Sequence, residues 1–162
     1  MAAVVIALGS NLGDRLANLR AAVAELKASG VTVQRCSSAW ETEPVPAGQP
    51  FFLNAVIVGE THLAPLPLLS LLKTIEQGMG RTEGARWGPR PIDLDILFYD
   101  ELSMDSETLT IPHARIAERA FVLAPLAEVV TGALPVLGRS AAAMLAALDA
   151  TGVSRFGPLG DS

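Results

Sequence analysis

An α+β fold with one antiparallel sheet is predicted by three observations. The chain has 162 residues, which is a usual length for one domain and is enough to close a hydrophobic core. Half of the residues are apolar and 18% are charged, which is a globular composition. Short apolar runs rich in β-branched residues alternate with two segments in which leucines recur at helical spacing. We therefore expect residues 1–162 to form a single domain.

The chain is predicted to begin with a strand and a helix. Residues 3–9 are a β-branched apolar run that ends in glycine, as strands often do. Asn11 is the expected N-cap of the helix that follows, with Asp14 in its first turn and Gly30 just beyond its end. Apolar residues at spacings of four and three form one face of this helix. They are Leu12, Leu16, Leu19, Val23 and Leu26.

Two more strands and a second helix are expected next. Residues 31–40 and 51–60 have strand composition, and the loop between them, residues 43–50, carries prolines and a glycine. Prolines in the first turn begin the second helix. This helix is marked by Pro65 and Pro67 and then by Leu68, Leu72, Ile75 and Met79.

Residues 92–99 are the fourth predicted strand. The order strand, helix, strand, strand, helix, strand matches the ferredoxin-like βαββαβ plan, in which both helices lie on one face of an antiparallel sheet. The other face is left for a site, or for the C-terminal extension to cover. In that extension we expect a short helix from the N-cap Ser140 to Ala150, and little structure in the last ten residues.

Composition also limits the partners and the compartment. A net charge of −5 argues against a protein that coats nucleic acid, because such proteins carry a basic face. The apolar stretches are interrupted too often to span a membrane, and the N-terminus lacks the basic region of a signal peptide. Cys36 is the only cysteine and cannot form an internal disulfide. We therefore expect a cytoplasmic monomer that binds neither nucleic acid nor membranes.

The strongest chemical signal is the sequence P-I-D-L-D-I-L-F-Y at residues 91–99. Alternate side chains of a strand share a face, so Asp93 and Asp95 are expected side by side. Two such carboxylates repel each other unless a cation lies near, and Mg²⁺ prefers carboxylate and phosphate oxygens. The alternative is a solvated face with one acid paired to an arginine. The opposite face of the strand, pointing to the core, is predicted to be Ile92, Leu94, Ile96 and Phe98.

A loop with three arginines and three glycines precedes these acids. Guanidinium groups bind phosphate in fork geometry, and glycines let a loop close over a ligand, with Trp87 as a cover. The alternative is an exposed turn whose charges only give solubility. The position directly before two aspartates favours phosphate binding. The loop residues are Arg81, Arg86 and Arg90 with Gly80, Gly84 and Gly88.

Other motifs exclude some nucleotide binders and leave alternatives open. The chain has neither a G-x-x-x-x-G-K-[ST] motif nor a G-x-G-x-x-G motif after a strand, which excludes P-loop and dinucleotide-binding folds. L-G-S-N-L-G after the first strand is either an anion site or a turn with an N-cap. His113 is either a phosphate donor or structural. Arg119 and Phe121 are either a cation–aromatic site or a surface arginine beside a core residue.

Several longer motifs occur in one order between residues 6 and 128. They are A-L-G-S-N-L-G-D-R, T-E-P-V, F-F-L-N-A-V, I-E-Q-G-M-G-R, R-W-G-P-R-P-I-D-L-D-I-L and I-P-H-A-R-I-A-E-R-A-F. By these motifs the chain resembles the 6-hydroxymethyl-7,8-dihydropterin pyrophosphokinases of folate biosynthesis. The resemblance implies a Mg²⁺-dependent enzyme whose partners are ATP and 6-hydroxymethyl-7,8-dihydropterin, and whose products are AMP and the pterin pyrophosphate.

The resemblance also implies roles for single residues. Asp93 and Asp95 would hold two Mg²⁺ ions and act in catalysis with Arg81 and Arg90. ATP would be bound by Glu76, Arg86, Trp87, Ile96, Thr110, His113 and Arg119. The pterin would be bound by Thr42, Pro44, Val45, Phe52, Asn54 and Phe121. Two aromatic faces suit a flat heterocycle, and an asparagine amide has both donors and an acceptor for its edge.

Three features depart from the usual family pattern. The arginine-bearing loop is one residue shorter and has Glu83 where a second arginine is frequent, and we expect this carboxylate to point away from the nucleotide. Phe52 stands where tyrosine is frequent, so a phenolic hydrogen bond is absent. Two other functions stay open, a non-catalytic module that binds a small anion and an RNA-binding domain. The net charge of −5 argues against RNA.

Overall fold

The computed structural model describes residues 1–43, 51–80 and 91–159. A six-stranded antiparallel sheet forms the centre of the fold. The strand order is β5-β1-β4-β3-β8. Strand β3 pairs with the first residues of β4, and β2 pairs with its last residues. These strands are β1 (Ala2–Ser10), β2 (Val31–Cys36), β3 (Ala39–Thr42), β4 (Phe52–Thr61), β5 (Asp93–Tyr99) and β8 (Val153–Gly157). A separate two-stranded sheet joins β6 (Met104–Asp105) and β7 (Thr110–Ile111).

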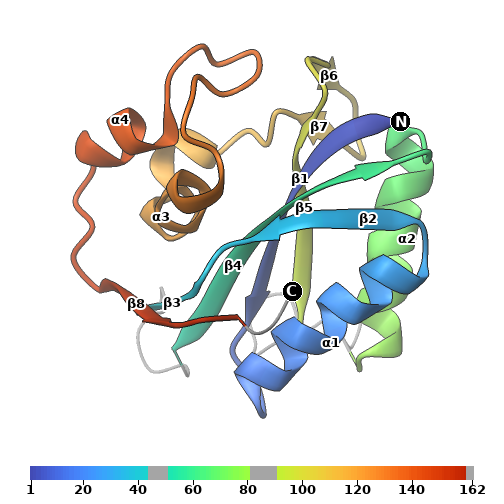
Figure 1. The fold of residues 1–162 in the computed structure, drawn as a ribbon, viewed down its shortest axis with the longest axis horizontal. Helices are drawn as coiled ribbons and strands as arrows, with labels where there is room; N and C mark the ends of the chain where they lie inside the picture. The colour runs from blue at the N-terminus through green and yellow to red at the C-terminus, as the bar shows by residue number, and fades with distance from the viewer. Residues whose placement is uncertain (44–50, 81–90, 160–162) are drawn as a thin grey trace.

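Helices cover both faces of the sheet (Figure 1). On one face lie α1 (Arg15–Ala28) and α2 (Pro65–Gly78), and on the other lie the 3₁₀ turn η1 (Ile116–Glu118), α3 (Ala120–Val129) and α4 (Ala141–Ala146). The predicted α+β fold is therefore confirmed, and the C-terminal extension covers the second face. Each face has its own core, because the side chains of a strand alternate between the two. Ile6, Leu19 and Leu72 belong to the first core, and Val5, Val56 and Leu123 to the second.

The start of α1 differs from the prediction. Asp14, not Asn11, is the N-cap, and its carboxylate accepts a hydrogen bond from the backbone N–H of Ala17 at 3.1 Å. The reason is that β1 continues to Ser10 and that Gly13, at a φ of +70°, turns the chain before the helix can begin. Leu12 therefore precedes the helix and is 44% exposed. The predicted cap residue Ser140 is confirmed for α4, where it accepts from the N–H of Ala143 at 3.1 Å, but this helix ends at Ala146.

The predicted strand over residues 31–40 is two strands, β2 and β3. Ser37 lies between them. Its hydroxyl accepts a hydrogen bond from the N–H of Val56 at 2.9 Å, while its own N–H donates to the carbonyl of Val56 at 2.9 Å. A side chain has thus replaced one rung of the β4 ladder, which ends β2.

A register shift in β5 changes the face of one predicted core residue. Val5 of β1 lies opposite Phe98, but the next residue, Ile6, lies opposite Ile96, so Leu97 is an extra residue in β5. A bulge of this kind shifts the alternation by one position. Phe98 therefore packs in the α3 core and not beside Ile96, contrary to the prediction.

The last ten residues were expected to have little structure, and this expectation is wrong for the part that the structure describes. Strand β8 pairs with β3, matching Trp40 with Arg155 and Thr42 with Val153. Beyond it, the guanidinium of Arg20 on α1 donates to the carbonyl of Leu159. Local composition underestimates such order because the stabilising partner is distant in sequence. Among the described residues, no helix combines the length and apolar character needed to cross a bilayer.

We expect Gly59→Ala to unfold the sheet more easily. Gly59 lies in β4 between Val4 of β1 and Val33 of β2, and an added Cβ would lie 2.4 Å from the carbonyl oxygen of Thr32. Backbone cannot move aside as a flexible side chain can, so the free energy of unfolding should fall by about 1–3 kcal/mol in a denaturant titration. Gly78→Ala on α2 is the control, since its Cβ meets nothing within 4 Å. Equal stability of the two variants would contradict the close approach.

Candidate active site

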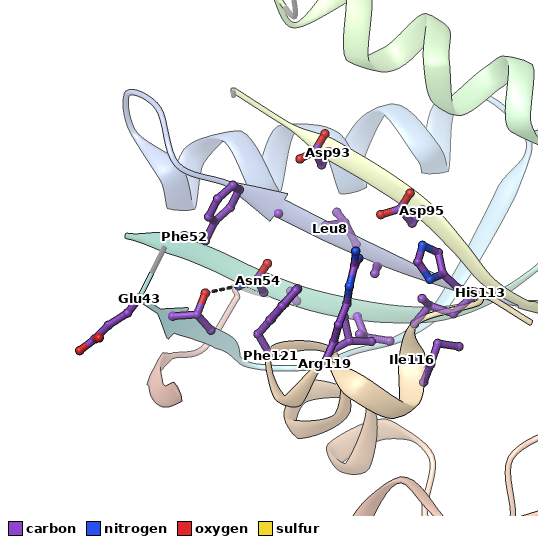
Figure 2. A pocket seen from close by; sticks show the side chains of 17 residues that line it. Leu8, Glu43, Phe52, Asn54, Asp93, Asp95, His113, Ile116, Arg119 and Phe121 are labelled. Carbon is purple, nitrogen blue, oxygen red and sulfur yellow. Dashed lines mark hydrogen bonds between the residues drawn. The ribbon is translucent and has the colours of Figure 1, made fainter. Parts of the chain in front are cut away.

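A cavity of about 280 Å³ opens between the sheet and the start of α3 (Figure 2). Strands β1, β4 and β5 supply its floor, and η1 and α3 supply one wall. The lining combines carboxylates, an imidazole, a guanidinium and two aromatic rings. Of the predicted site residues, the cavity is lined by Thr42, Phe52, Asn54, Asp93, Asp95, His113, Arg119 and Phe121.

The predicted aspartate pair lies on one face of β5, at the cavity (Figure 2). Asp93 lies opposite Gly9 of β1 and Asp95 opposite Ala7. Leu94, between them, is buried on the other face, and its N–H donates to the carboxylate of Glu76 at 2.8 Å. Glu76 is itself 5% exposed, so α2 holds this end of β5 from behind. The bulge at Leu97 comes after both acids and leaves their common orientation unchanged.

His113 lies beside this pair. Its backbone N–H donates to the carbonyl of Leu97 at 3.1 Å, which fixes it next to β5. Burial lowers the pKa of His113 below its ordinary value, against the opposing effect of Asp95 and with a further lowering by Arg119 and Arg115. The imidazole is therefore neutral at pH 7. Its Nδ1 accepts from the N–H of Arg115 at 3.3 Å, so its proton is assigned to Nε2, which is then a hydrogen-bond donor.

Arg119 and Phe121 project together from the start of α3. The guanidinium carbon of Arg119 lies 5.6 Å from the centroid of the Phe121 ring, within the range of a cation–π contact. Figure 2 shows the Arg119 side chain extending from α3 toward the strands. The ring thus helps to hold the one described cation of the cavity lining above the sheet.

The opposite end of the cavity has a polar floor between aromatic residues. The Asn54 side-chain N–H donates to the hydroxyl of Thr42 at 2.9 Å, and this bond is buried. This hydrogen bond sets the orientation of the side-chain amide. The side-chain oxygen Oδ1 of Asn54 is then available as an acceptor. Phe52 comes from the start of β4 and Phe121 from α3, so two elements distant in sequence supply the rings.

Glu128 fixes α3, and with it Phe121, against the sheet edge. Its carboxylate accepts from the N–H of Ser38 at 3.1 Å, from the Ser38 hydroxyl at 2.9 Å and from the indole N–H of Trp40. Charge-assisted hydrogen bonds of this kind are stronger than neutral ones. Arg155 of β8 also donates to the Ser38 hydroxyl at 2.9 Å, so the C-terminal strand joins the same contact.

Three predicted residues do not line this cavity. Glu76 lies behind β5, Ile96 is buried in the α1 and α2 core, and the Thr110 hydroxyl lies on β7 near Asp105, at 3.4 Å. Six others lie outside the described residues. They are Pro44, Val45, Arg81, Arg86, Trp87 and Arg90. Glu83 also lies outside the described residues, as does most of the loop over residues 80–90, which was expected to close over a ligand.

Some residues that line the cavity were not predicted from the sequence. Gly9 is the clearest case. A Cβ there would lie 2.9 Å from the side-chain oxygen Oδ1 of Asn54 and 3.7 Å from Cδ1 of Phe52. The glycine gives the Asn54 amide its space. Pairing of Gly9 with Asn54 in the β1–β4 register, together with strand alternation, was the available signal. The other missed lining residues are Ala7, Leu8, Glu43, Ala55, Val56, Leu97, Ile116 and Val122.

Comparison with known proteins gives a consistent family. The model of the family 7,8-dihydro-6-hydroxymethylpterin-pyrophosphokinase (HPPK) matches residues 5–131. The 2-amino-4-hydroxy-6-hydroxymethyldihydropteridine pyrophosphokinase of Bacillus subtilis is 51% identical over 126 residues, covering 76% of this chain and 75% of its own length. That of Methylorubrum extorquens is 41% identical over 157 residues, covering 96% of this chain and 99% of its own length.

Some relatives are much longer. The mitochondrial folate synthesis bifunctional protein of Arabidopsis thaliana is 54% identical over 132 residues, which are 81% of this chain but only 24% of that protein. This chain thus spans about a quarter of the length of the plant relatives it matches. Among solved structures, Plasmodium falciparum HPPK-DHPS with pteroate has a TM-score of 0.73 at 15% identity, over 90% of this chain and 44% of that one, which shows a shared fold. The extent of the family match and the identity to relatives of similar length show that the chain belongs to the 7,8-dihydro-6-hydroxymethylpterin-pyrophosphokinase family.

Proposed function

We propose that the chain transfers pyrophosphate from ATP to the hydroxymethyl group of 6-hydroxymethyl-7,8-dihydropterin, with AMP as the second product. The observation that carries this proposal is the combination found in one cavity. Two carboxylates, a neutral histidine and an arginine lie at one end, and an asparagine between phenylalanines lies at the other. The first group suits a polyphosphate with its cation, and the second suits a flat heterocycle with polar edges.

The residues present fit a Mg²⁺ requirement. Mg²⁺ is usually held by one or two carboxylates together with substrate phosphates, and Asp93 and Asp95 supply two carboxylates on one face. The described residues contain no group of three or more His, Cys, Asp or Glu that could hold a metal, so a dedicated protein cage is not the expected arrangement. We infer that Asp93 and Asp95 hold two Mg²⁺ ions with ATP. When bound, Mg²⁺ would offset phosphate charge.

The chain's own groups would bind and orient both substrates. Arg119 and the Nε2–H of His113 are placed to donate to phosphate oxygens, and we assign Arg81, Arg86, Arg90 and Trp87 to the nucleotide from their sequence pattern. Glu76, Ile96 and Thr110 are assigned to the nucleotide from the family pattern alone, since none of the three lines the described cavity. Phe52, Phe121, Asn54 and Thr42, with Pro44 and Val45, would hold the pterin. Positioning contributes much of the rate in such transfers.

In the proposed reaction the hydroxymethyl oxygen of the pterin attacks the β-phosphorus of ATP. The bond between that phosphorus and the oxygen bridging to the α-phosphate breaks, and AMP leaves with the bridging oxygen. The hydroxyl proton passes to solvent. We assign no lining residue as general base. The task of the site is to align the attacked phosphorus with the two oxygens and to offset charge.

We also infer that residues 1–162 act as one pyrophosphokinase domain, as a monomer in the cytoplasm. The N-terminal strand β1 and the C-terminal strand β8 belong to the same six-stranded sheet, which supports a single domain. The half-buried thiol of Cys36, whose pKa burial raises, is suited to a packing role and not to disulfide formation. Sedimentation of the purified chain would measure its mass in solution.

The test of the proposed function is direct product analysis. The chain, ATP, Mg²⁺ and 6-hydroxymethyl-7,8-dihydropterin should yield AMP and the pterin pyrophosphate in equal amounts. Omission of the pterin or chelation of Mg²⁺ should stop AMP release. A folded chain that binds ATP but forms neither product would instead support the non-catalytic anion-binding module.

We expect Gly9→Ala to weaken pterin use selectively. The new methyl group would displace the Asn54 amide, whose oxygen lies 2.9 Å from the Cβ position, and its contact with the pterin edge would be lost. The KM for pterin should rise about three- to tenfold, the usual range for one hydrogen bond, with little change in the KM for ATP. Gly132→Ala is the control, because a Cβ there meets nothing within 4 Å. An unchanged pterin KM in Gly9→Ala would exclude Asn54 from recognition.

A further inference from the structure

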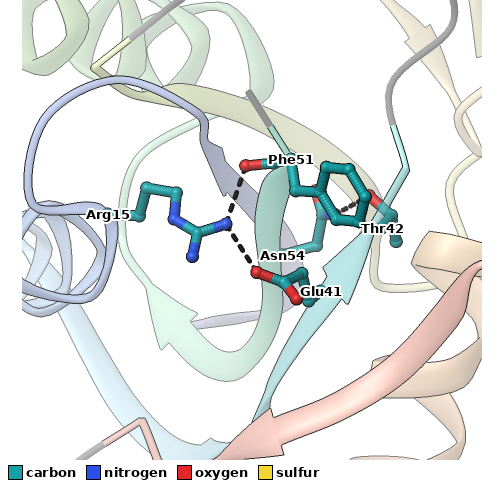
Figure 3. Close-up of polar contacts among 5 residues, drawn as sticks. All are labelled: Arg15, Glu41, Thr42, Phe51 and Asn54. Carbon is teal, nitrogen blue, oxygen red and sulfur yellow. Dashed lines mark hydrogen bonds and ion pairs between the residues drawn. The ribbon is translucent and has the colours of Figure 1, made fainter. Parts of the chain in front are cut away.

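Arg15 contacts Glu41 and the backbone of Phe51 beside the cavity without lining it (Figure 3). It is the first residue of α1. Its Nη1 donates to the backbone carbonyl of Phe51 at 2.8 Å and lies 2.9 Å from the Glu41 carboxylate on β3. Its guanidinium carbon lies 5.7 Å from the centroid of the Phe156 ring on β8. One side chain thus links the helix to β3, to β8 and to the residue that precedes β4.

Both residues whose oxygens contact Arg15 are adjacent in sequence to residues that line the cavity. Glu41 precedes Thr42, and Phe51 precedes Phe52. Thr42 and Phe52 are also opposite each other in the β3–β4 register. A shift at the end of β3 or at the start of β4 would therefore displace a residue that lines the site. It would also disturb the hydrogen bond from Asn54 to Thr42.

The strand pairing alone is short at this end. Strand β3 has four residues, and its pairing with β4 matches Trp40 with Asn54, Glu41 with Leu53 and Thr42 with Phe52. So short a ladder frays readily at its end. The Arg15 contacts lie at that end, where they add a cross-link from outside the sheet.

We propose that Arg15 is a positioning residue for the pterin compartment, acting through Glu41 and the Phe51 carbonyl. This inference rests on the proposed function. A planar guanidinium can hydrogen-bond these two oxygens while its face lies over Phe156, whereas a lysine ammonium lacks the stacking face. The Arg15 and Glu41 side chains are 24% and 30% exposed, so solvent screens the ion pair and its contribution to global stability is small. Its effect is expected in ligand binding.

Arg15→Ala, Arg15→Lys and the control Arg20→Ala provide the test. Arg20 lies on the same helix but donates to the carbonyl of Leu159 and not to that of Phe51. The pterin Kd, measured by calorimetry with a non-hydrolysable ATP analogue present, should rise about five- to tenfold in Arg15→Ala, the effect of about one ordinary hydrogen bond. Arg15→Lys should recover part of this loss, and Arg20→Ala should bind pterin like wild type. The Kd of the ATP analogue should change less than twofold in all three variants.

Glu41→Gln closes a double-mutant cycle with Arg15→Ala. If both residues act through their shared contact, the double variant should bind pterin no more weakly than Arg15→Ala alone. Wild-type pterin affinity in Arg15→Ala, or equal weakening of both ligands with a large fall in the melting temperature, would overturn the positioning role. Failure of the wild-type chain to bind pterin would instead count against the proposed function, so the two failures can be distinguished.

Discussion

Replacing Asp95 with asparagine is expected to lower turnover by about two orders of magnitude or more while the fold is retained. Asp95 faces the cavity from β5, so the core packing of this strand, carried by Leu94 and Ile96, is unaffected. The amide keeps the size of the side chain but removes an anionic oxygen that would hold Mg²⁺ with the ATP phosphates. Loss of that charge stabilisation accounts for several kcal/mol of the barrier.

The measurement is steady-state AMP release over a range of Mg²⁺ concentrations, with the melting temperature as a check on folding. Glu25→Gln is the matched control, since it removes one carboxylate charge from an exposed position on α1, on the other side of the sheet. We expect the control to retain wild-type turnover. Near wild-type turnover of Asp95→Asn at limiting Mg²⁺ would show that the metal assignment is wrong.

Phe121→Ala is expected to weaken pterin binding about tenfold or more and ATP binding much less. Besides the main cavity, Phe121 lines a second cavity of about 330 Å³, which is bounded by Leu148 and by residues near Gly152. The ring therefore contributes to the lining of both cavities, and its removal enlarges the space at this end of the site. The pterin would lose a stacking face, worth roughly 0.5–1.5 kcal/mol beyond burial, and water would reach that side of the heterocycle.

Phe121→Leu separates the aromatic contribution from simple filling of space. Leucine keeps an apolar wall but has no ring face, so its pterin Kd should lie between those of wild type and Phe121→Ala. Both Kd values, for pterin and for the ATP analogue, are measured by calorimetry together with unfolding midpoints. Equal weakening of the two ligands would identify Phe121 as a packing residue of the α3 core and not as part of the pterin compartment.

Strand periodicity was sufficient to place the aspartate pair. The alternation of Asp93 and Asp95 with Ile92 and Leu94 is a local property, since neighbouring side chains of a strand point to opposite faces whatever the partner strand. Helix α2 was equally local, because prolines in the first turn and leucines at helical spacing act within the segment itself. The family motifs lie in these same local patterns, and they were enough to indicate the pyrophosphokinase family.

The tertiary structure decided the features that depend on a distant partner. The bulge that moves Phe98 to the other core arises from the β1–β5 register, and β8 forms because β3 offers it an open edge. The space that Gly9 leaves for Asn54 exists only once β1 and β4 are paired. Such pairings join residues far apart in the chain, so no local pattern of hydrophobicity encodes them. The sequence by itself predicted which residues carry the chemistry, and the packing of distant strands decided which of the described ones line one cavity.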